Sequence, residues 1–348
     1  MILRRKLAVI LCLAVPAIAA ATHALAQDYI KSPATVTVRA TPIASFDTAE
    51  PSRTRFGALE FRGGLALTSS EPAFGGISGL RVEADGAHFL AVTDSGSWLR
   101  GRIVYSDGRP SGIADAEMAP LLGPDGKPLA ARGWYDAESL ENDNGTLYVG
   151  LERVEKIVRF DYARDGLKAQ ARVLPAPDDF RTFTYNKSLE CLAMPPQGSP
   201  LAGTLIAVTE RSLDAAGNHR AYLLDGARSE PPEAGRAGRF SVKRSDGFDV
   251  SDCTILPPFD LLLLERHFSP ARGVLMRIRR IPLATLKPGA LVDGTQLITA
   301  DLGFQIDNME GIAVHKNAQG ETIITMVSDD NFSVFQRNLL LQFALVAD

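Results

Sequence analysis

Two positions, mostly acidic, recur along this chain in five comparable units, and this repeat limits the architectures that the chain can adopt. In each unit an acidic or polar residue lies near the start of an apolar run, and 13 to 20 residues later a second apolar run ends in an acid. The first positions are Ser78, Glu138, Glu190, Asp252 and Glu310, and the second are Asp94, Glu152, Glu210, Glu265 and Asp329. The second position returns every 55 to 64 residues, a period near that of propeller blades.

Each unit has the sequence pattern of a β-hairpin. Turn residues separate the two apolar runs at 83–86, 141–145, 197–203 and 317–320, and a tighter turn at 256–260 does so in unit four. In an antiparallel hairpin the first strand begins beside the end of the second. We therefore expect the two acids of each unit to meet, and five hairpins around an axis to form a ring of carboxylates at one mouth of a central channel.

The remaining strands predict an all-β β-propeller of four-stranded blades. Third strands are expected at 101–107, 156–162, 220–226, 273–281 and 339–346, and fourth strands at 114–122, 169–176, 238–244 and 294–302. The fifth unit lacks a fourth strand, and residues 57–67 can supply it and close the ring. We count five units. Residues 28–50 add either a strand or a degenerate sixth blade, and a plain β-sandwich is the alternative fold.

The N-terminal residues have the pattern of a secretory signal peptide. Arg4, Arg5 and Lys6 precede an apolar stretch, and the small residues of Ala24-Leu25-Ala26 mark a cleavage site. We expect residues 1–26 to be removed and residues 27–348 to form a single domain, periplasmic or secreted. A membrane anchor is the alternative for the N-terminal stretch. No later apolar run is long enough to cross a bilayer.

Charge and cysteine content narrow the chemistry further. Without residues 1–26 the formal charge falls from −4 to −7, which argues against nucleic acid as a partner. Cys191 and Cys253 each follow the first acid of their unit, so strand alternation should turn both away from the channel. We favour two buried thiols over a disulfide, because neighbouring inner strands of a propeller usually stand too far apart for disulfide geometry.

A ring of carboxylates needs positive charge inside it, and oxygen ligands in such number suit Ca²⁺. The candidate metal ligands are Asp94, Glu138, Glu190, Asp252, Asp307, Glu310, Asp329 and Asp330. The alternative is a structural ring of salt bridges, since an arginine follows Glu152, Glu210 and Glu265 directly.

Basic residues of the same units suit an anionic, oxygen-rich substrate such as a phosphate ester or a carboxylate. The candidates for substrate binding are Arg153, Lys187, Arg211, Arg266 and Arg337. In hydrolysis the metal would polarise the ester or activate a water, and a ring acid would act as general base. The catalytic candidates are Glu138, Glu190, Glu310 and His267. Ser78 lacks the spacing of a nucleophile elbow and is a minor alternative.

Several segments together resemble the bacterial phytase-like family, known as "esterase-like activity of phytase". They are FGGISGL, VTDSG, DAESLE, SLECLA, the strand ends VTER and LLER, DNMEGIA, and SDDNFSVFQRNLLLQF, and they span about residues 56–345. The resemblance implies a β-propeller that hydrolyses phosphomonoesters or other esters. It also implies that Glu138, Glu190, Asp252, Glu310 and Asp329 are channel residues. The calcium-dependent propeller phytases have acid-lined channels with bound Ca²⁺ but contain six blades.

These observations favour an exported, metal-dependent hydrolase of phosphate or carboxylate esters that acts on a small substrate as a monomer. Two alternatives remain. One is a non-catalytic periplasmic propeller that binds a ligand or a protein, and the other is a calcium-dependent lactonase. Measuring bound Ca²⁺ and chelator-sensitive turnover separates the enzyme from the binding protein.

Overall fold

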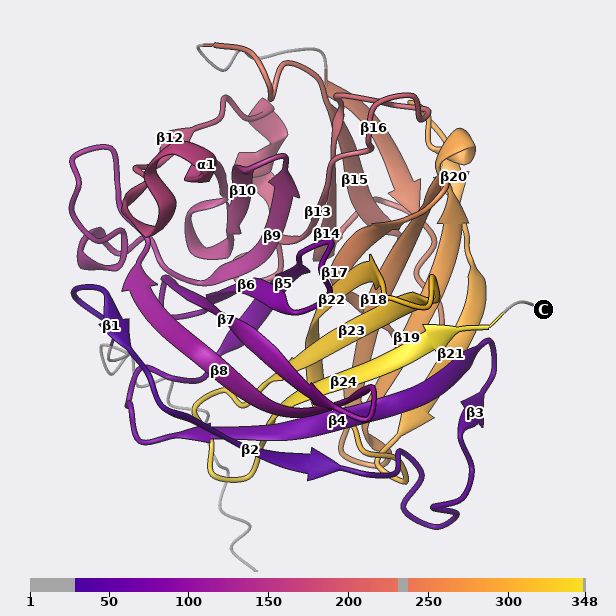
Figure 1. Cartoon of the computed structure of the whole chain (residues 1–348). Coiled ribbons are helices and arrows are strands. Elements are labelled where there is room, and N and C mark those ends of the chain that lie inside the picture. The colour runs from indigo at the N-terminus through magenta and orange to yellow at the C-terminus, as the bar shows by residue number, and fades with distance from the viewer. Residues whose placement is uncertain (1–28, 231–236, 347–348) are drawn as a thin grey trace, which may run out of the picture.

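The chain folds into five mainly antiparallel sheets arranged around an axis as a β-propeller, as the repeat predicts (Figure 1). The computed structural model describes residues 29–230 and 237–346. Within these residues the helical content is small: one α-helix, α1 (Tyr162–Asp165), and short 3-10 turns at Ala130–Arg132, Glu152–Val154, Gly166–Lys168, Asp178–Thr182 and Leu283–Thr285.

Each blade has four principal strands, counted outward from the channel. Blade one contains β5 (Ile77–Val82), β6 (His88–Thr93), β7 (Ser97–Ser106) and β8 (Arg109–Pro120). Blade two contains β9 (Ala137–Asp143), β10 (Thr146–Leu151), β11 (Lys156–Asp161) and β12 (Arg172–Val173). Blade three contains β13 (Leu189–Ala193), β14 (Leu205–Leu213), β15 (His219–Leu224) and β16 (Ala237–Val242). Blade four contains β17 (Asp249–Leu256), β18 (Asp260–Ser269), β19 (Gly273–Pro282) and β21 (Thr295–Asp301).

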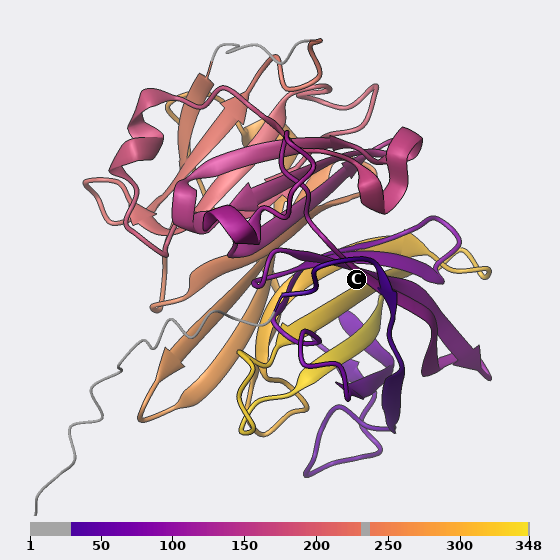
Figure 2. The same ribbon diagram turned by 90° about the vertical axis from the view of Figure 1, so that its left-hand side faces the viewer.

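Blade five joins the two ends of the described chain. It contains β22 (Asn308–Lys316), β23 (Thr322–Asp329), β24 (Asn338–Leu345) and the early strand β4 (Leu59–Ser69). β4 pairs antiparallel with β24 along most of its length, so the predicted closure by an N-terminal strand is confirmed. Figure 2 shows the indigo N-terminal segment against the yellow C-terminal strands. Such closure removes the exposed sheet edges that an open array would leave.

The segments before β4 add edge strands and do not form a sixth blade. β2 (Val38–Ile43) pairs with the outer side of β4, and β3 (Arg55–Phe56) pairs with its beginning. β1 (Ala34–Thr35) extends blade one beside β8, and β20 (Leu291–Val292) extends blade three beside β16. The described part of the chain therefore has five blades, each of which has a neighbour on both sides.

The hydrophobic core lies between the blades. Phe46 and Phe343 are fully buried and meet edge to face with ring centres 4.9 Å apart, within the core shared by blades four and five. Trp98 is fully buried and meets Phe160 at 5.1 Å where blades one and two pack together. Burying apolar surface at about 25 cal/mol per Å² is the main force that holds the sheets together.

The innermost strands approach one another closely around the channel, and two glycines allow it. A Cβ on Gly79 would lie 2.6 Å from the backbone nitrogen of Leu140, and one on Gly311 would lie 2.3 Å from the carbonyl oxygen of Ser78. Neither position has room for a side chain without backbone movement.

The expectation of two free thiols is wrong, because Cys191 and Cys253 form a disulfide with a Cα–Cα distance of 5.0 Å. β13 and β17 are neighbouring innermost strands, and near the axis they come within disulfide reach. The expectation failed because it took neighbouring innermost strands to stand too far apart for a disulfide, whereas here they approach to 5.0 Å at these two residues. Both sulfur atoms are buried in the core between blades three and four.

The predicted signal segment, residues 1–26, lies outside the described residues. Among the residues that the structure describes, no helix is long and apolar enough to cross a membrane.

Candidate active site at the channel mouth

A β-bulge at the start of three innermost strands presents a glutamate at the mouth. In blade two, Ala137 pairs with Leu151 and Ser139 pairs with Gly150, so Glu138 between them has no partner. The same interruption leaves Glu190 unpaired in blade three and Glu310 unpaired in blade five. A bulge re-aims the extra side chain and commonly borders functional sites.

These three bulge residues lie together, as the repeat predicts. One carboxylate oxygen from each of Glu138, Glu190 and Glu310 lies within 4.8 Å of the others. Glu152 and Glu210 extend the group, because they form a similar trio with Glu190. We call these five residues the carboxylate cluster.

The sequence interpretation missed Asp136, which forms a third close trio with Glu138 and Glu152. Asp136 lies in the segment YDAESL, two residues before the bulge. Its backbone carbonyl accepts a hydrogen bond from Glu152 N at 2.9 Å, which places it opposite the second acid of its unit. The interpretation considered only acids inside the apolar runs and therefore passed over it.

Asp94 and Asp329 lie beside the carboxylate cluster at blades one and five. Asp94 accepts a hydrogen bond from Ser78 Oγ at 2.6 Å, and burial followed by the charge of Asp329 raises its pKa well above the usual value. Burial also raises the pKa of Asp329 to about 7, although Asn331 N donates to it. The serine that breaks the acid pattern in unit one is thus a hydrogen-bond donor to a mouth carboxylate.

Blade four departs from the predicted ring by one residue. Val250 pairs with Glu265 and Asp252 pairs with Leu264, so Ser251 is the bulge residue of this blade. A shift of one residue turns every side chain of a strand to the opposite face. The predictions that Asp252 and Glu265 line the ring are therefore wrong, and Ser251 and Arg266 occupy the corresponding positions.

Arg266 brings a positive charge to the position where the other four blades have an acid. Its guanidinium lies 3.4 Å from Glu210 and 3.4 Å from Glu310, and donates to Asn308 Oδ1 at 2.9 Å. Burial alone would lower the pKa of Arg266, but the carboxylates of Glu310 and Glu210 raise it above its usual value. The arginine therefore stays charged and partly neutralises the carboxylate cluster.

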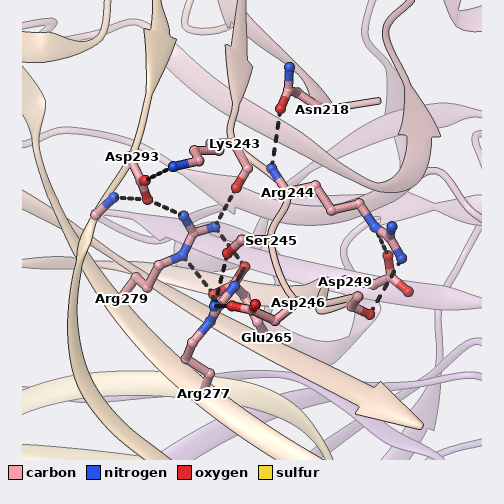
Figure 3. Close-up of polar contacts among 12 residues, drawn as sticks. Asn218, Lys243, Arg244, Ser245, Asp246, Asp249, Glu265, Arg277, Arg279 and Asp293 are labelled. Carbon is pink, nitrogen blue, oxygen red and sulfur yellow. Dashed lines mark hydrogen bonds and ion pairs between the residues drawn. The ribbon is translucent and has the colours of Figure 1, made fainter. Parts of the chain in front are cut away.

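Glu265 instead lies inside blade four, where two arginines hold it (Figure 3). Arg277 and Arg279 each donate two hydrogen bonds to its carboxylate, at 2.6 to 3.0 Å. Arg279 also pairs with Asp293 at 2.7 Å. The glutamate is fully buried, and this network serves the stability of blade four.

Asp252 lies below the ring, where Arg81 closes the channel. The Arg81 guanidinium donates to Glu141 Oε2 at 2.9 and 3.1 Å and lies 3.6 Å from Asp252 Oδ2. It also donates to carbonyl oxygens from blades one, three, four and five, those of Leu80, Leu192, Cys253 and Ile312. Through Glu141 of blade two, a single side chain thus contacts all five blades. Sequence patterns gave no indication of this role for Arg81.

The other predicted basic residues pair with acids around the mouth. Lys187 Nζ lies 2.7 Å from Glu210 Oε2, in contact with the carboxylate cluster. Arg153 pairs with Asp136 at 3.0 Å, and Arg211 pairs with Asp249.

Four more predicted residues, Asp307, Asp330, His267 and Arg337, make contacts outside the carboxylate cluster. Asp307 pairs with Arg337 at 3.5 Å. Asp330 accepts hydrogen bonds from Gly76 N and from Asn338 Nδ2, which anchor the loop after β23. His267 Nδ1 lies 2.8 Å from the carbonyl oxygen of Gly247. The structure thus places these side chains near the mouth but not in the carboxylate cluster.

The carboxylate cluster has the properties of a cation site. Glu190 Oε2 and Glu310 Oε2 are buried and have no hydrogen-bond partner. Burial raises the pKa of Glu152 to about 7 and, together with Asp329, that of Glu310 to about 8. Burial and neighbouring carboxylates also raise the pKa of Glu190. Unpaired carboxylate oxygens from several strands form the ligand set that hard divalent cations bind.

Comparison with known proteins identifies the family. The family model described as "Phytase-like: Esterase-like activity of phytase" matches residues 72–332. The chain belongs to this family, as its sequence segments predict. No curated protein matches the chain.

Solved structures with a similar fold include the glutaminyl cyclase of Myxococcus xanthus, with 14% identity and a TM-score of 0.42 over 79% of this chain and 92% of that one. The Dos1 propeller has 12% identity and a TM-score of 0.34, over 83% of this chain and 75% of that one. The N-terminal domain of Nup159 has 11% identity and a TM-score of 0.39, over 85% of this chain and 97% of that one. These proteins are similar to this chain in fold alone.

Proposed function

We propose that this member of the phytase-like family is a hydrolase of phosphate or carboxylate esters that depends on a divalent cation, Ca²⁺, at the channel mouth. The observation that carries the proposal is the convergence of Glu138, Glu190 and Glu310, whose oxygens lie within 4.8 Å of one another. Two of these glutamates keep a buried oxygen without a partner. A buried carboxylate is costly unless it is paired or binds a metal.

Glu138, Glu190 and Glu310 would hold the cation, with Glu152 and Glu210 beside them. Ca²⁺ takes six to eight oxygen ligands in a flexible arrangement, which suits acids contributed by separate strands. When bound, the cation would polarise the ester bond and lower the pKa of a water molecule.

The residues of the chain supply the other functions. Arg266 and Lys187 lie within 3.4 Å of cluster carboxylates, where their charges would hold an anionic oxygen of the substrate. A cluster carboxylate that does not bind the cation would accept the proton of the attacking water. Because Arg81 closes the channel below, the substrate would enter and the product would leave through the mouth.

We further propose that residues 27–348 form one exported domain that works as a monomer in the periplasm or outside the cell. The signal pattern at the N-terminus supports export. The disulfide between Cys191 and Cys253 supports it too, since such bonds persist mainly in oxidising compartments.

Metal analysis and turnover test the proposal. We expect purified protein to bind Ca²⁺ and to hydrolyse p-nitrophenyl phosphate or p-nitrophenyl acetate in a chelator-sensitive way. Glu310→Gln should weaken Ca²⁺ binding and turnover, whereas Glu50→Gln, at an exposed residue in the segment between β2 and β3, should change neither. Metal-free protein without turnover would contradict the proposal, and metal binding without turnover would favour the non-catalytic binding propeller.

A further inference from the structure

The four most exposed large apolar side chains of the described residues all lie on the mouth side of the propeller. They are Val334 (94% exposed), Phe335 (93%), Phe268 (71%) and Tyr185 (61%), and we call them the apolar rim. Exposed apolar residues gathered around a polar site commonly mark a binding surface.

Chain connections place the apolar rim beside the mouth. Phe268 follows Arg266 by two residues at the end of β18. Val334 and Phe335 lie in the loop between β23 and β24, which begins just after Asp329. Tyr185 lies in the segment that leads into β13, five residues before Glu190. The rim therefore draws on blades three, four and five.

The loop that carries Val334 and Phe335 is held against the mouth. Asp330 accepts hydrogen bonds from Gly76 N and Asn338 Nδ2. A Cβ on Gly76 would lie 2.7 Å from the Phe332 ring and 3.1 Å from Asp94 Oδ2. The Phe332 ring and the Asp94 carboxylate thus both border Gly76, which places this loop at the mouth.

A second connection leads from Tyr185 to Asp136, which adjoins Glu138 and Glu152 of the carboxylate cluster. The Arg153 guanidinium lies 4.5 Å from the ring centre of Tyr135 and 5.8 Å from that of Tyr185. The same guanidinium pairs with Asp136 at 3.0 Å. Tyr185 is therefore linked through one arginine to the acids of blade two.

We propose that the natural ligand is amphiphilic: its anionic or ester group binds at the carboxylate cluster, and its apolar chain lies on the rim. The inference rests on the proposed function, because the cation site would hold the polar group. Glu190 and Glu310 are buried, so the polar group of the ligand must pass below the protein surface to reach them, whereas a bilayer would present a flat surface of head groups. The negative formal charge of the chain also disfavours an anionic lipid surface.

Calorimetric titration of the Ca²⁺-loaded full chain with n-octylphosphonate and with ethylphosphonate tests this inference, because their P–C bonds are not cleaved by an ester hydrolase. We expect octylphosphonate to bind at least about tenfold more tightly, since each buried CH₂ contributes to affinity. The double variant Val334→Ser/Phe335→Ser should lose most of this difference, and both side chains are too exposed to be needed for folding. Phe259→Ser, in the β17–β18 turn at the other end of blade four, should keep it.

The other outcomes separate this inference from the proposed function. Equal affinities for the two phosphonates would overturn the proposal of an amphiphilic ligand. If octylphosphonate binds in a rim-dependent way with the same affinity with and without Ca²⁺, and ethylphosphonate does not bind, the rim is a binding surface and the cation site is rejected. Binding of neither compound would overturn both. Equal affinities together with rim-dependent binding to neutral phosphatidylcholine vesicles would assign the rim to a lipid surface.

Discussion

Arg81 of blade one and Asp252 of blade four lie 3.6 Å apart across the axial channel, guanidinium to carboxylate. The contact joins strands on opposite sides of the axis. Glu141 of blade two completes the group, and all three side chains are buried. The channel therefore ends at an ion-paired floor, which separates the carboxylate cluster above it from the lower face.

Replacing Arg81 should destabilise the whole propeller. Arg81→Met leaves Glu141 and Asp252 buried without their cation, and breaking such a group by removing one partner costs about 3–5 kcal/mol. We expect a loss of this size in the free energy of unfolding by urea. Arg100→Met removes an exposed pair with Glu117 and should cost less than about 1 kcal/mol. Equal losses for the two variants would show that the floor contributes no special stability.

The disulfide should stabilise the junction of blades three and four. Cys191 and Cys253 are 62 residues apart in sequence. Closing a loop of that length lowers the conformational entropy of the unfolded chain, which stabilises the folded state by about 4 kcal/mol. Cys191→Ser/Cys253→Ser should lower the urea midpoint, and added reductant should lower that of the natural chain but leave the variant unchanged. A reductant-insensitive midpoint for the natural chain would contradict the pairing.

The repeat predicted the number of blades and the closure of the ring, because both follow from the order of strands. It failed in blade four because two neighbouring residues fit each repeat position equally well by spacing. Asp252 is preceded by Ser251, and Glu265 is followed by Arg266. Matching acid to acid selects the wrong member of each pair, and only the pairing of Val250 with Glu265 reveals the shift. Arg81 was missed because it belongs to no repeated pattern.

Stability of the metal-free protein should fall as pH rises from about 5 to 8. The pKa values of Glu152 and Asp329 are raised to about 7 and that of Glu310 to about 8. The folded state then binds more protons than the unfolded state in this range. Each additional bound proton lowers the free energy of unfolding by about 1.4 kcal/mol per pH unit as the pH rises. Thermal unfolding in a chelator should show the decline.

Calcium should reverse that decline, because the cation replaces the protons that the carboxylates lose. The increase in melting temperature on adding Ca²⁺ should therefore be larger at pH 8 than at pH 5. Glu310→Gln should flatten the pH dependence in the chelator, since one raised pKa is removed. A Ca²⁺ effect that does not change with pH would argue against binding at these acids.

Glu310 and Glu265 both belong to the acid pattern, as the first acid of unit five and the second acid of unit four, yet the structure predicts opposite results for their amide variants. Glu310→Gln removes one negative charge from the carboxylate cluster, whose members repel one another. The fold should therefore remain stable while Ca²⁺ affinity falls. Glu265→Gln leaves Arg277 and Arg279 buried without their shared counter-charge, which should cost about 3–5 kcal/mol. Urea unfolding and Ca²⁺ titration of both variants, measured under conditions where each is folded, compare the two effects. Reduced Ca²⁺ affinity in the Glu265 variant at full stability would place that side chain back in the ring and refute the one-residue shift of blade four.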